Sequence, residues 1–499
     1  YKYDIVKVLK INGGDIMFDF TFILIIDCIS ILSLIFLERK KPVEALAWIL
    51  VVVFLPILGV LLYIFFGDTI SLKFQFKFYK NKELDESITT FIDYQKQLLQ
   101  YQNLPQVKEE YKDILYMIMN QNKSSYTLDN KVEIIVDGHE YKEKLFNDIK
   151  NAKKSICIAY YIISNNKMGH EFMQLLIDKA NEGIEVRVIY DFIGGFFMQY
   201  FNRYYFKKLK KAGGKVFRFL PSFWSSLLRI NYRYHRKMAI IDSKIGYTGG
   251  FNIGDEYLGL RKSCTPWRDT QIRVEGDVVF DLLVKYIQDY EYVRSLSKNA
   301  PKEEYEHLFT NLVHSSPGEV CMQLVACGPE IIQEEIKDAY IKMINKASKY
   351  VYIQTPYFIP DESIMTALRL AINSGVDVKI IIPGIPDKSS VYLASLSFVY
   401  DLLELGIEVY TYNGFIHAKN IIIDDYVVSI GSTNIDVRSF ALNFEINSFI
   451  FNEKFATHNK EIFLNDIKHS TLYTMEKYKN RPAISRLGSH ILRLFSTIM

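Results

Sequence analysis

The sequence contains few of the residues that build metal sites and disulfide frameworks. Its 499 residues include only five cysteines and nine histidines. No Cys-x-x-Cys pair or Cys/His cluster suggests zinc. Five scattered cysteines are too few for a disulfide scaffold, so we expect a reduced body that faces the cytosol. A phosphate-binding P-loop is also lacking, which leaves no sign of a bound nucleotide.

An excess of charge of either sign is also lacking, because the formal net charge is only +3. A polyanionic partner must therefore be met by a local patch. Residues 192–241 provide one, with no Asp or Glu and eleven Lys or Arg among interleaved aromatics. Such a surface suits anionic lipid headgroups or nucleic acid. The alternative is a solvated basic helix on a packed aromatic face.

Two long apolar runs, at residues 16–37 and 43–66, stand near the N-terminus. Each is long enough to cross a hydrocarbon core of about 30 Å. We predict a transmembrane helical hairpin within residues 1–67, rather than two buried helices of a soluble protein. Asp27 is unfavourable there, since an acid at the bilayer centre costs about 2.5–3.5 kcal/mol. With lysines continuing from the second run into a large body, we place that body on the cytoplasmic side of a cell membrane.

Two short segments are near copies of each other. His235–Asp242 reads HRKMAIID and His417–Asp424 reads HAKNIIID, so both have the form H-x-K-x4-D. The composition predicts roughly 0.12 such segments by chance. Alternate residues of a strand share a face, so each histidine projects on the same side as the lysine two residues later. Small-residue turns ending in asparagine follow both segments.

An imidazole beside an ammonium suits attack on a phosphate ester. A neutral nitrogen attacks phosphorus to form a phosphohistidine, which splits one difficult displacement into two. The second imidazole donates a proton to the departing alkoxide and then takes one from the incoming hydroxyl. The predicted catalytic residues are His235, Lys237, Asp242, His417, Lys419 and Asp424, with Asn252, Ser432 and Asn434 as further ligands of the phosphate oxygens. A turn role for Asp242 and Asp424 is an equally good interpretation.

The segments belong to a longer repeat. From about residue 130, strand and helix signals alternate twice in the same order, and residues 344–358 echo residues 149–161. Such units with β-branched strands predict an α/β fold of two similar sandwich halves. We place these halves at residues 129–305 and 306–499, after a helical connector near the membrane at 68–128. For residues 484–499 we expect an amphipathic segment, and both an interfacial helix and a docking segment fit it.

With these two segments and this repeat, the chain resembles the phospholipase D superfamily, and within it the bacterial cardiolipin synthases with two such motifs. The likeness covers nearly the whole chain from Glu38 onward. Further motifs that carry it include Trp267-Arg268-Asp269 and the run from Gly431 to Glu445. The resemblance implies one active site shared at the interface of the halves, without a metal or another cofactor. It also favours His235 as the nucleophile and His417 as the acid, with Asp269 and Glu445 fixing the tautomers of the imidazoles.

The reaction implied by the resemblance is phosphatidyl transfer between two phosphatidylglycerol molecules, giving cardiolipin and glycerol. The expected partners are phosphatidylglycerol and other anionic phospholipids in a membrane, with no nucleic acid. Three alternatives remain open. They are a related hydrolase or phosphatidyltransferase on the same scaffold, a membrane-anchored nuclease, and a membrane scaffold without activity.

Overall fold

The computed structural model describes residues 25–26, 28–36, 42–66, 92–98, 107–194, 203–219, 232–296, 303–309, 318–329 and 333–494. The chain forms two compact units. One comprises Tyr1–Phe78 with Ser222–Asn231, and the larger one comprises Tyr79–Pro221 with Tyr232–Met499. Much of the predicted basic aromatic surface, at residues 195–202 and 220–231, lies outside the described residues.

The N-terminal unit contains the second predicted span, and the structure divides that span into two helices. These are α2 (Pro42–Phe54) and α3 (Leu58–Phe66). The break falls at Pro56, which has no N–H to donate, and at Ile57, which has a φ of 61°. Among the described residues, no helix has the length and apolarity needed to cross a membrane. The predicted transmembrane hairpin is therefore not seen, and much of its first run lies outside the described residues.

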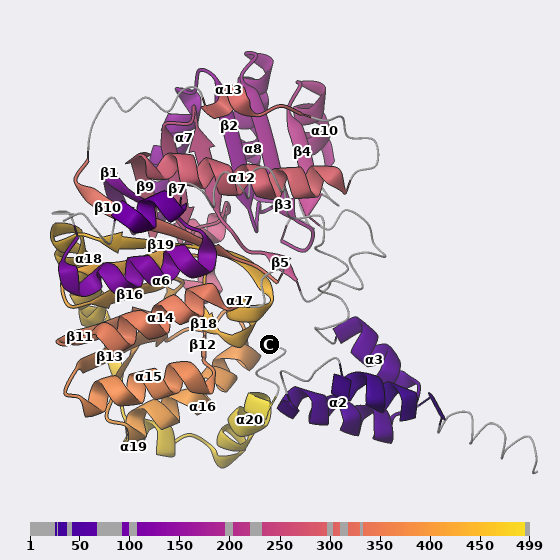
Figure 1. Ribbon diagram of the computed structural model, residues 1–499, viewed down its shortest axis with the longest axis vertical. Coiled ribbons are helices and arrows are strands. Elements are labelled where there is room, and N and C mark those ends of the chain that lie inside the picture. Colours follow the sequence, from indigo (N-terminus) through magenta and orange to yellow (C-terminus); the bar gives the residue numbers. More distant parts are fainter. Residues whose placement is uncertain are drawn as a thin grey trace, which may run out of the picture. The chain divides into compact units, whose positions relative to one another are not determined.

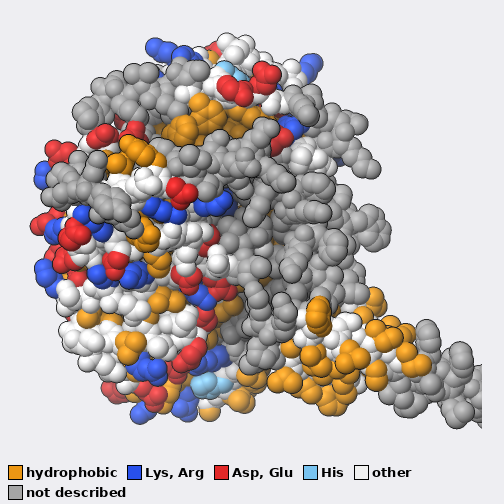
Figure 2. Space-filling view, in the orientation of Figure 1, with side chains coloured by type: hydrophobic (Ala, Val, Ile, Leu, Met, Phe, Trp, Pro, Cys, Tyr) orange, Lys and Arg blue, Asp and Glu red, His pale blue; other side chains and the backbone are white. Residues whose placement is uncertain are grey.

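Apolar side chains cover much of the surface of this unit (Figure 2). Its small core consists of Leu34, Val52 and Tyr63, and the ring of Trp48 packs edge-on against Tyr63 at 5.3 Å. Many other apolar side chains of the unit face outward. The exposed ones include Ile29, Leu32, Ile35, Phe36, Leu46, Leu50, Val53, Phe54 and Leu58.

The larger unit is built on one 16-stranded sheet that contains the same strand order twice. The first half contributes β1 (Tyr126–Ile135), β9 (Gln271–Gly276), β7 (Ile245–Gly249), β6 (Met238–Ile241), β2 (Ser155–Tyr160), β3 (Glu185–Asp191) and β4 (Lys215–Phe219), in spatial order. The second half contributes β10 (Val320–Cys327), β19 (Asn443–Phe451), β17 (Val427–Gly431), β16 (Asn420–Ile423), β11 (Tyr350–Gln354), β13 (Asp377–Pro383), β14 (Glu408–Tyr412) and β20 (Ser470–Tyr473). Antiparallel pairing of β1 with β10 joins the halves, and the sixteenth strand, β5 (Arg233–Tyr234), pairs with β19 outside this path. The duplicated α/β fold predicted from the sequence is confirmed.

Helices cover both faces of the sheet in each half. Successive side chains of the central strands point to opposite faces and pack against these helices. In β2, Ile156 and Ile158 share a core with α7 (Gly138–Lys150) and α8 (Lys167–Asn181). In β11, Val351 and Ile353 share a core with α14 (Glu335–Lys346) and α15 (Glu362–Asn373). Tyr352 lies between them in sequence and stacks instead on α18 (Glu453–Lys468), with its ring 4.7 Å from that of Phe463. Strands buried on both faces are largely apolar, and β2 and β11 are so apart from Ser155 and Gln354 at their ends.

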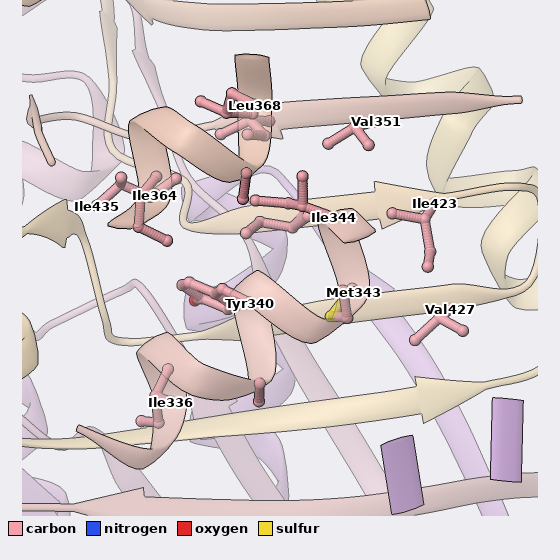
Figure 3. Packing of buried hydrophobic residues seen from close by; sticks show 14 of the residues in the cluster. Ile336, Tyr340, Met343, Ile344, Val351, Ile364, Leu368, Ile423, Val427 and Ile435 are labelled. Atoms are coloured by element: carbon pink, nitrogen blue, oxygen red, sulfur yellow. The ribbon is translucent and has the colours of Figure 1, made fainter. Parts of the chain in front are cut away.

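Helical periodicity places α14 on the sheet of the second half. Its buried residues Ile336, Tyr340, Met343 and Ile344 recur at helical spacing and point towards the strands that carry Val351, Ile423 and Val427 (Figure 3). In Figure 1, α14, α15 and α16 (Ser389–Glu404) lie at one end of this unit, and α7, α8 and α12 (Val278–Ser295) lie at the other. The helix α6 (Lys112–Asn122), within the predicted connector, also buries Ile114 and Leu115 in the core of the second half.

Candidate active site

Each H-x-K segment is hydrogen-bonded to a strand of the opposite half. The short strand β5 (Arg233–Tyr234) runs parallel to the start of β19, and the backbone N–H of His235 donates to Phe444 at 2.9 Å. The short strand β15 (Phe415–Ile416) runs parallel to β8 (Trp267–Arg268), and the N–H of His417 donates to Arg268 at 2.6 Å. The duplication thus places both histidines at the interface of the halves.

In each case the residue whose carbonyl accepts this backbone hydrogen bond is followed by a buried acid. Nδ1 of His235 lies 2.9 Å from both carboxylate oxygens of Glu445, and Nδ1 of His417 lies 2.6 Å from Oδ2 of Asp269. Both acids are fully buried. The carboxylates hold the imidazole proton on Nδ1, which leaves each Nε2 as the reactive nitrogen. The acids proposed from the sequence thus pair crosswise, each with the histidine of the other half.

A glycine makes room for one of these acids. The ideal position of a Cβ atom on Gly250 lies 1.9 Å from Oδ1 of Asp269, a distance that excludes any side chain. Oδ1 of Asp269 also accepts from the N–H of Thr270 at 2.7 Å. The small-residue turn after the first motif is therefore needed for the approach of Asp269.

The two motif lysines are buried and bind the backbone of their own motif. Nζ of Lys237 donates to the carbonyl of His235 at 2.6 Å, and Nζ of Lys419 donates to that of His417 at 2.5 Å. Burial lowers the pKa of Lys237 to about 7 and that of Lys419 to about 8. The charges of Glu445 and Asp269 oppose this lowering of both pKa values. Both ammonium groups are therefore buried behind the histidines rather than in the cavity wall, and their charge is easily lost.

Burial also keeps both imidazoles neutral at neutral pH. It lowers the pKa of His235 to about 4, against the opposing charge of Glu445. It lowers the pKa of His417 to about 4, and the charge of Lys419 adds to this effect. A neutral imidazole with a free Nε2 is the form that attacks phosphorus.

Both histidines line one cavity of about 890 Å³. Its walls come from both halves and combine apolar and charged side chains. Besides the histidines, they include Tyr161, Ser164, Asn166, Arg233, Asn252, Glu256, Tyr257, Arg261, Trp267, Tyr357, Asp387, Lys388, Asn434, Asp436, Arg438 and Ser439. Among the described residues, no group of three or more His, Cys, Asp or Glu side chains could hold a metal ion.

The three predicted polar ligands of phosphate differ in their surroundings. Asn252 and Asn434 line the cavity. Nδ2 of Asn252 donates to the hydroxyl of Tyr257 at 2.7 Å, and Nδ2 of Asn434 donates to Ser439 at 3.2 Å. The hydroxyl of Ser432 instead donates to Oε2 of Glu445 at 2.5 Å. Ser432 therefore orients the acid that orients His235.

The motif aspartates lie at the far ends of their strands. Asp242 follows β6 and accepts from the N–H groups of Lys153, Lys154 and Ser155 at 2.7–3.0 Å. Asp424 follows β16 and accepts from three backbone N–H groups before and within β11, at residues 348–350. Their φ values of 53° and 52° place both in the left-handed region of a hairpin turn. Four strand residues lie between each aspartate and its lysine, so the two are five positions, about 16 Å, apart along the strand. This geometry favours the turn interpretation over a catalytic one.

Aromatic rings around the histidines were not predicted as part of the site. The ring of Tyr161 lies 5.1 Å from that of His235, and the ring of Trp267 lies 5.4 Å from that of His417. Phe415 stacks on His417 at 5.9 Å. Strand alternation could have located Phe415, and likewise Arg233, because each stands two residues before a motif histidine.

Two similar α/β halves, each with an H-x-K motif whose histidine lines one shared cavity, define a phospholipase D-like protein. Residues 145–265 and 340–467 match the family model described as "Cardiolipin synthase, PLD-like domain". Residues 20–67 match the model described as "Phospholipase_D-nuclease N-terminal".

Similarity to known proteins identifies the family within this class. The chain is 43% identical to a cardiolipin synthase of Oceanobacillus iheyensis, over 94% of this chain and 96% of that protein. It is 41% identical to the major cardiolipin synthase ClsA of Bacillus subtilis, over 95% and 98% of the two chains. The chain therefore belongs to the cardiolipin synthase family. A crystal structure of phosphatidylserine synthase from Haemophilus influenzae Rd KW20 shares the fold, with a TM-score of 0.58 at 15% identity over 78% of this chain and 100% of that one.

Replacing Asp424 by alanine separates a structural from a catalytic role. The change leaves three backbone N–H groups without their acceptor, so we expect the free energy of unfolding to fall by about 1–3 kcal/mol. Denaturant unfolding measures this loss. Activity per folded molecule should stay within a few-fold of wild type, and a loss as deep as that of His235→Ala would restore the catalytic interpretation.

Proposed function

We propose that this chain is a cardiolipin synthase, which transfers a phosphatidyl group from one phosphatidylglycerol molecule to another and releases glycerol. The observation that carries the proposal is the pair of neutral imidazoles that face one cavity, each held by a buried acid of the opposite half. The identity of 40–43% to cardiolipin synthases over nearly the whole chain supports the substrate class.

In the first step, Nε2 of His235 attacks the phosphorus of the donor lipid in line. His417 donates a proton to the departing glycerol oxygen, and a phosphatidyl–histidine intermediate remains. In the second step, His417 takes a proton from a glycerol hydroxyl of the acceptor lipid, whose oxygen then displaces His235. Lys237, Lys419, Asn252 and Asn434 hold the non-bridging oxygens, and Ser432 acts through Glu445 rather than on the phosphate.

Substrate binding prepares the acid for the first step. The charge of an arriving phosphate favours the cationic forms of nearby groups, so it raises the pKa of His417 and of both lysines. The empty site holds neutral imidazoles, as attack requires, and the loaded site stabilises one protonated imidazole, as departure of glycerol requires. No nucleotide is needed, because one phosphodiester is exchanged for another.

We also propose that the N-terminal segment anchors the enzyme in the cell membrane, as a hairpin with the catalytic body on the cytoplasmic side. The exposed apolar side chains of α2 and α3 support this location. A second membrane contact is α20 (Ala483–Leu494), whose exposed Ile484, Leu487, Ile491 and Leu494 recur at helical spacing. The basic side chain of Arg486 lies in the same helix.

Lipid product analysis tests the proposed reaction. Purified full-length protein should convert labelled phosphatidylglycerol into cardiolipin and glycerol, and His235→Ala should lower that rate by 10³-fold or more, because the nucleophile is removed. Phosphatidic acid without cardiolipin would indicate a hydrolase instead. Retained cardiolipin formation in the His235→Ala, His417→Ala double variant would exclude the mechanism.

The pH dependence of kcat/KM tests the charges of the site. Lys237 and Lys419 must be cationic to bind phosphate, so kcat/KM should fall as pH rises through about 7–8, where the pKa values of the free enzyme lie. Glu445 raises the pKa of Lys237. The Glu445→Gln variant should therefore move this alkaline limb to lower pH, besides lowering kcat. A limb at the wild-type position would show that Glu445 does not act on Lys237.

Substitution of the exposed apolar face of α2 tests the anchor. We expect the full-length protein to stay with the membrane fraction after a high-salt wash, and the Leu46→Glu, Leu50→Glu variant to be released in larger part, because two charges on that face oppose insertion. Leu370→Glu is the matched control, since Leu370 on α15 is as exposed as Leu50, at 54% against 56%. Equal retention of both variants would contradict the anchor.

A further inference from the structure

The duplication gives the two ends of the cavity equivalent residues of different charge. Two residues before His235 stands Arg233, whereas Phe415 stands two residues before His417. Four residues after Asn434 stands Arg438, whereas Glu256 stands four residues after Asn252. Arg233, Arg438 and Glu256 line the cavity. At these two pairs of equivalent positions, one half therefore carries two cations where the other carries an aromatic ring and a carboxylate. The cavity wall also includes Arg261, Lys388, Asp387 and Asp436.

The backbone supports this equivalence. Ile253 forms a parallel bridge with Ile163 just after β2, and Ile435 pairs in parallel with Phe358 just after β11. Short helices then follow in both halves, at Asp255–Leu258 and Val437–Ala441. Glu256 and Arg438 therefore occupy corresponding places in the duplicated fold.

Contacts place Glu256 at the His417 end. The next residue, Tyr257, has its ring 6.1 Å from that of His417 and 4.9 Å from that of Trp267. Arg438 belongs to the opposite end, because its charge and that of Arg233 act together on the phenol of Tyr161. Tyr161 in turn packs 5.1 Å from His235. Glu256 thus lines the same cavity as His417 and is joined directly to Tyr257, whose ring packs near that imidazole.

Two hydrogen bonds fix the position of the Glu256 carboxylate. Oε1 accepts from the hydroxyl of Ser164 at 2.6 Å, and Oε2 accepts from Nδ2 of Asn166 at 3.0 Å. Gly254 makes the room, since a Cβ atom there would lie 2.6 Å from both Oε2 of Glu256 and Oγ of Ser164. Each carboxylate oxygen can accept a second hydrogen bond. The two carboxylate oxygens of Glu256 can therefore accept hydrogen bonds from two hydroxyl groups of one ligand.

A carboxylate is an unfavourable neighbour for a phosphate, so its place in this cavity calls for a neutral ligand rich in hydroxyls. We propose that Glu256, held by Ser164 and Asn166, binds the free hydroxyls of the glycerol headgroup beside His417. The inference rests on the proposed function above and deepens it. The site selects a vicinal diol over a simple alcohol or water, both as leaving group and as acceptor.

A glycerol site beside His417 also breaks the symmetry between the two histidines. The glycerol oxygen that leaves or attacks lies on the side of phosphorus opposite the nucleophile, as in-line displacement requires. With the glycerol at the His417 end, His417 is the acid and base, and His235 is the nucleophile. The cationic end, with Arg233 and Arg438, then faces the covalently held phosphate.

A competition between alcohols tests the site. Full-length enzyme with phosphatidylglycerol as donor receives equal concentrations of 1,2-propanediol and 1-propanol, and the two phosphatidyl alcohols are quantified. Both products arise from one intermediate, so their ratio is independent of donor binding and of the folded fraction. We expect wild type to favour the diol and Glu256→Gln to lower the ratio about tenfold, because a charged acceptor is replaced by a neutral one.

The Arg438→Gln variant is the matched control from the corresponding position of the other half. Its ratio should equal that of wild type, even where its total rate differs. An unchanged ratio in Glu256→Gln, or a fall confined to Arg438→Gln, overturns the proposal. So does preferred transfer to ethanolamine, whose ammonium a carboxylate among aromatic rings can also bind. If wild type makes no cardiolipin at all, the proposed function fails before any ratio is compared, and the two failures are thereby distinguished.

Discussion

Each of the two imidazoles depends on a carboxylate that the other half supplies. A buried carboxylate is costly unless hydrogen bonds replace its water. Glu445 has His235, the hydroxyl of Ser432 and Nδ2 of Asn443 at 3.1 Å, and Asp269 has His417 and the N–H of Thr270. Neither acid is satisfied by its own half alone. The crossed pairs therefore make the two halves one unit, both for stability and for catalysis.

The same burial governs the charge of the site. Two ammonium groups and two imidazoles are buried in the same site, and burial lowers all four pKa values. Phosphate is the ligand that relieves this, because its negative charge stabilises every cation around it. We therefore expect substrate binding to favour the protonated forms of these lysines and imidazoles. Two lysines in such surroundings provide the electrostatic stabilisation that a preorganised site needs.

Much of the arrangement could be predicted from the sequence, because it is repeated. The H-x-K spacing, the alternation of strands and the echo between halves predicted the duplicated fold, and the family resemblance indicated both acids. Their crosswise pairing could not be predicted, since it depends on which distant strands run side by side, as β5 does with β19. The contact of Ser432 with Glu445 arises in the same way. For Asp242 and Asp424, the pattern left a turn and a catalytic role equally open, and only the backbone contacts distinguish them. The break at Pro56 shows that an apolar run of sufficient length does not imply one continuous helix.

The central claim is that two histidines from two halves serve one phosphate, with His235 as the sole nucleophile. Trapping the covalent intermediate tests it most directly. Enzyme quenched during turnover of phosphatidylglycerol labelled with ³²P is digested, and the labelled peptide is mapped. The account predicts at most one label per chain, located on His235, and more of it in His417→Ala supplied with a donor whose leaving group needs no protonation. Label on His417, or on both histidines of one chain, would contradict the account.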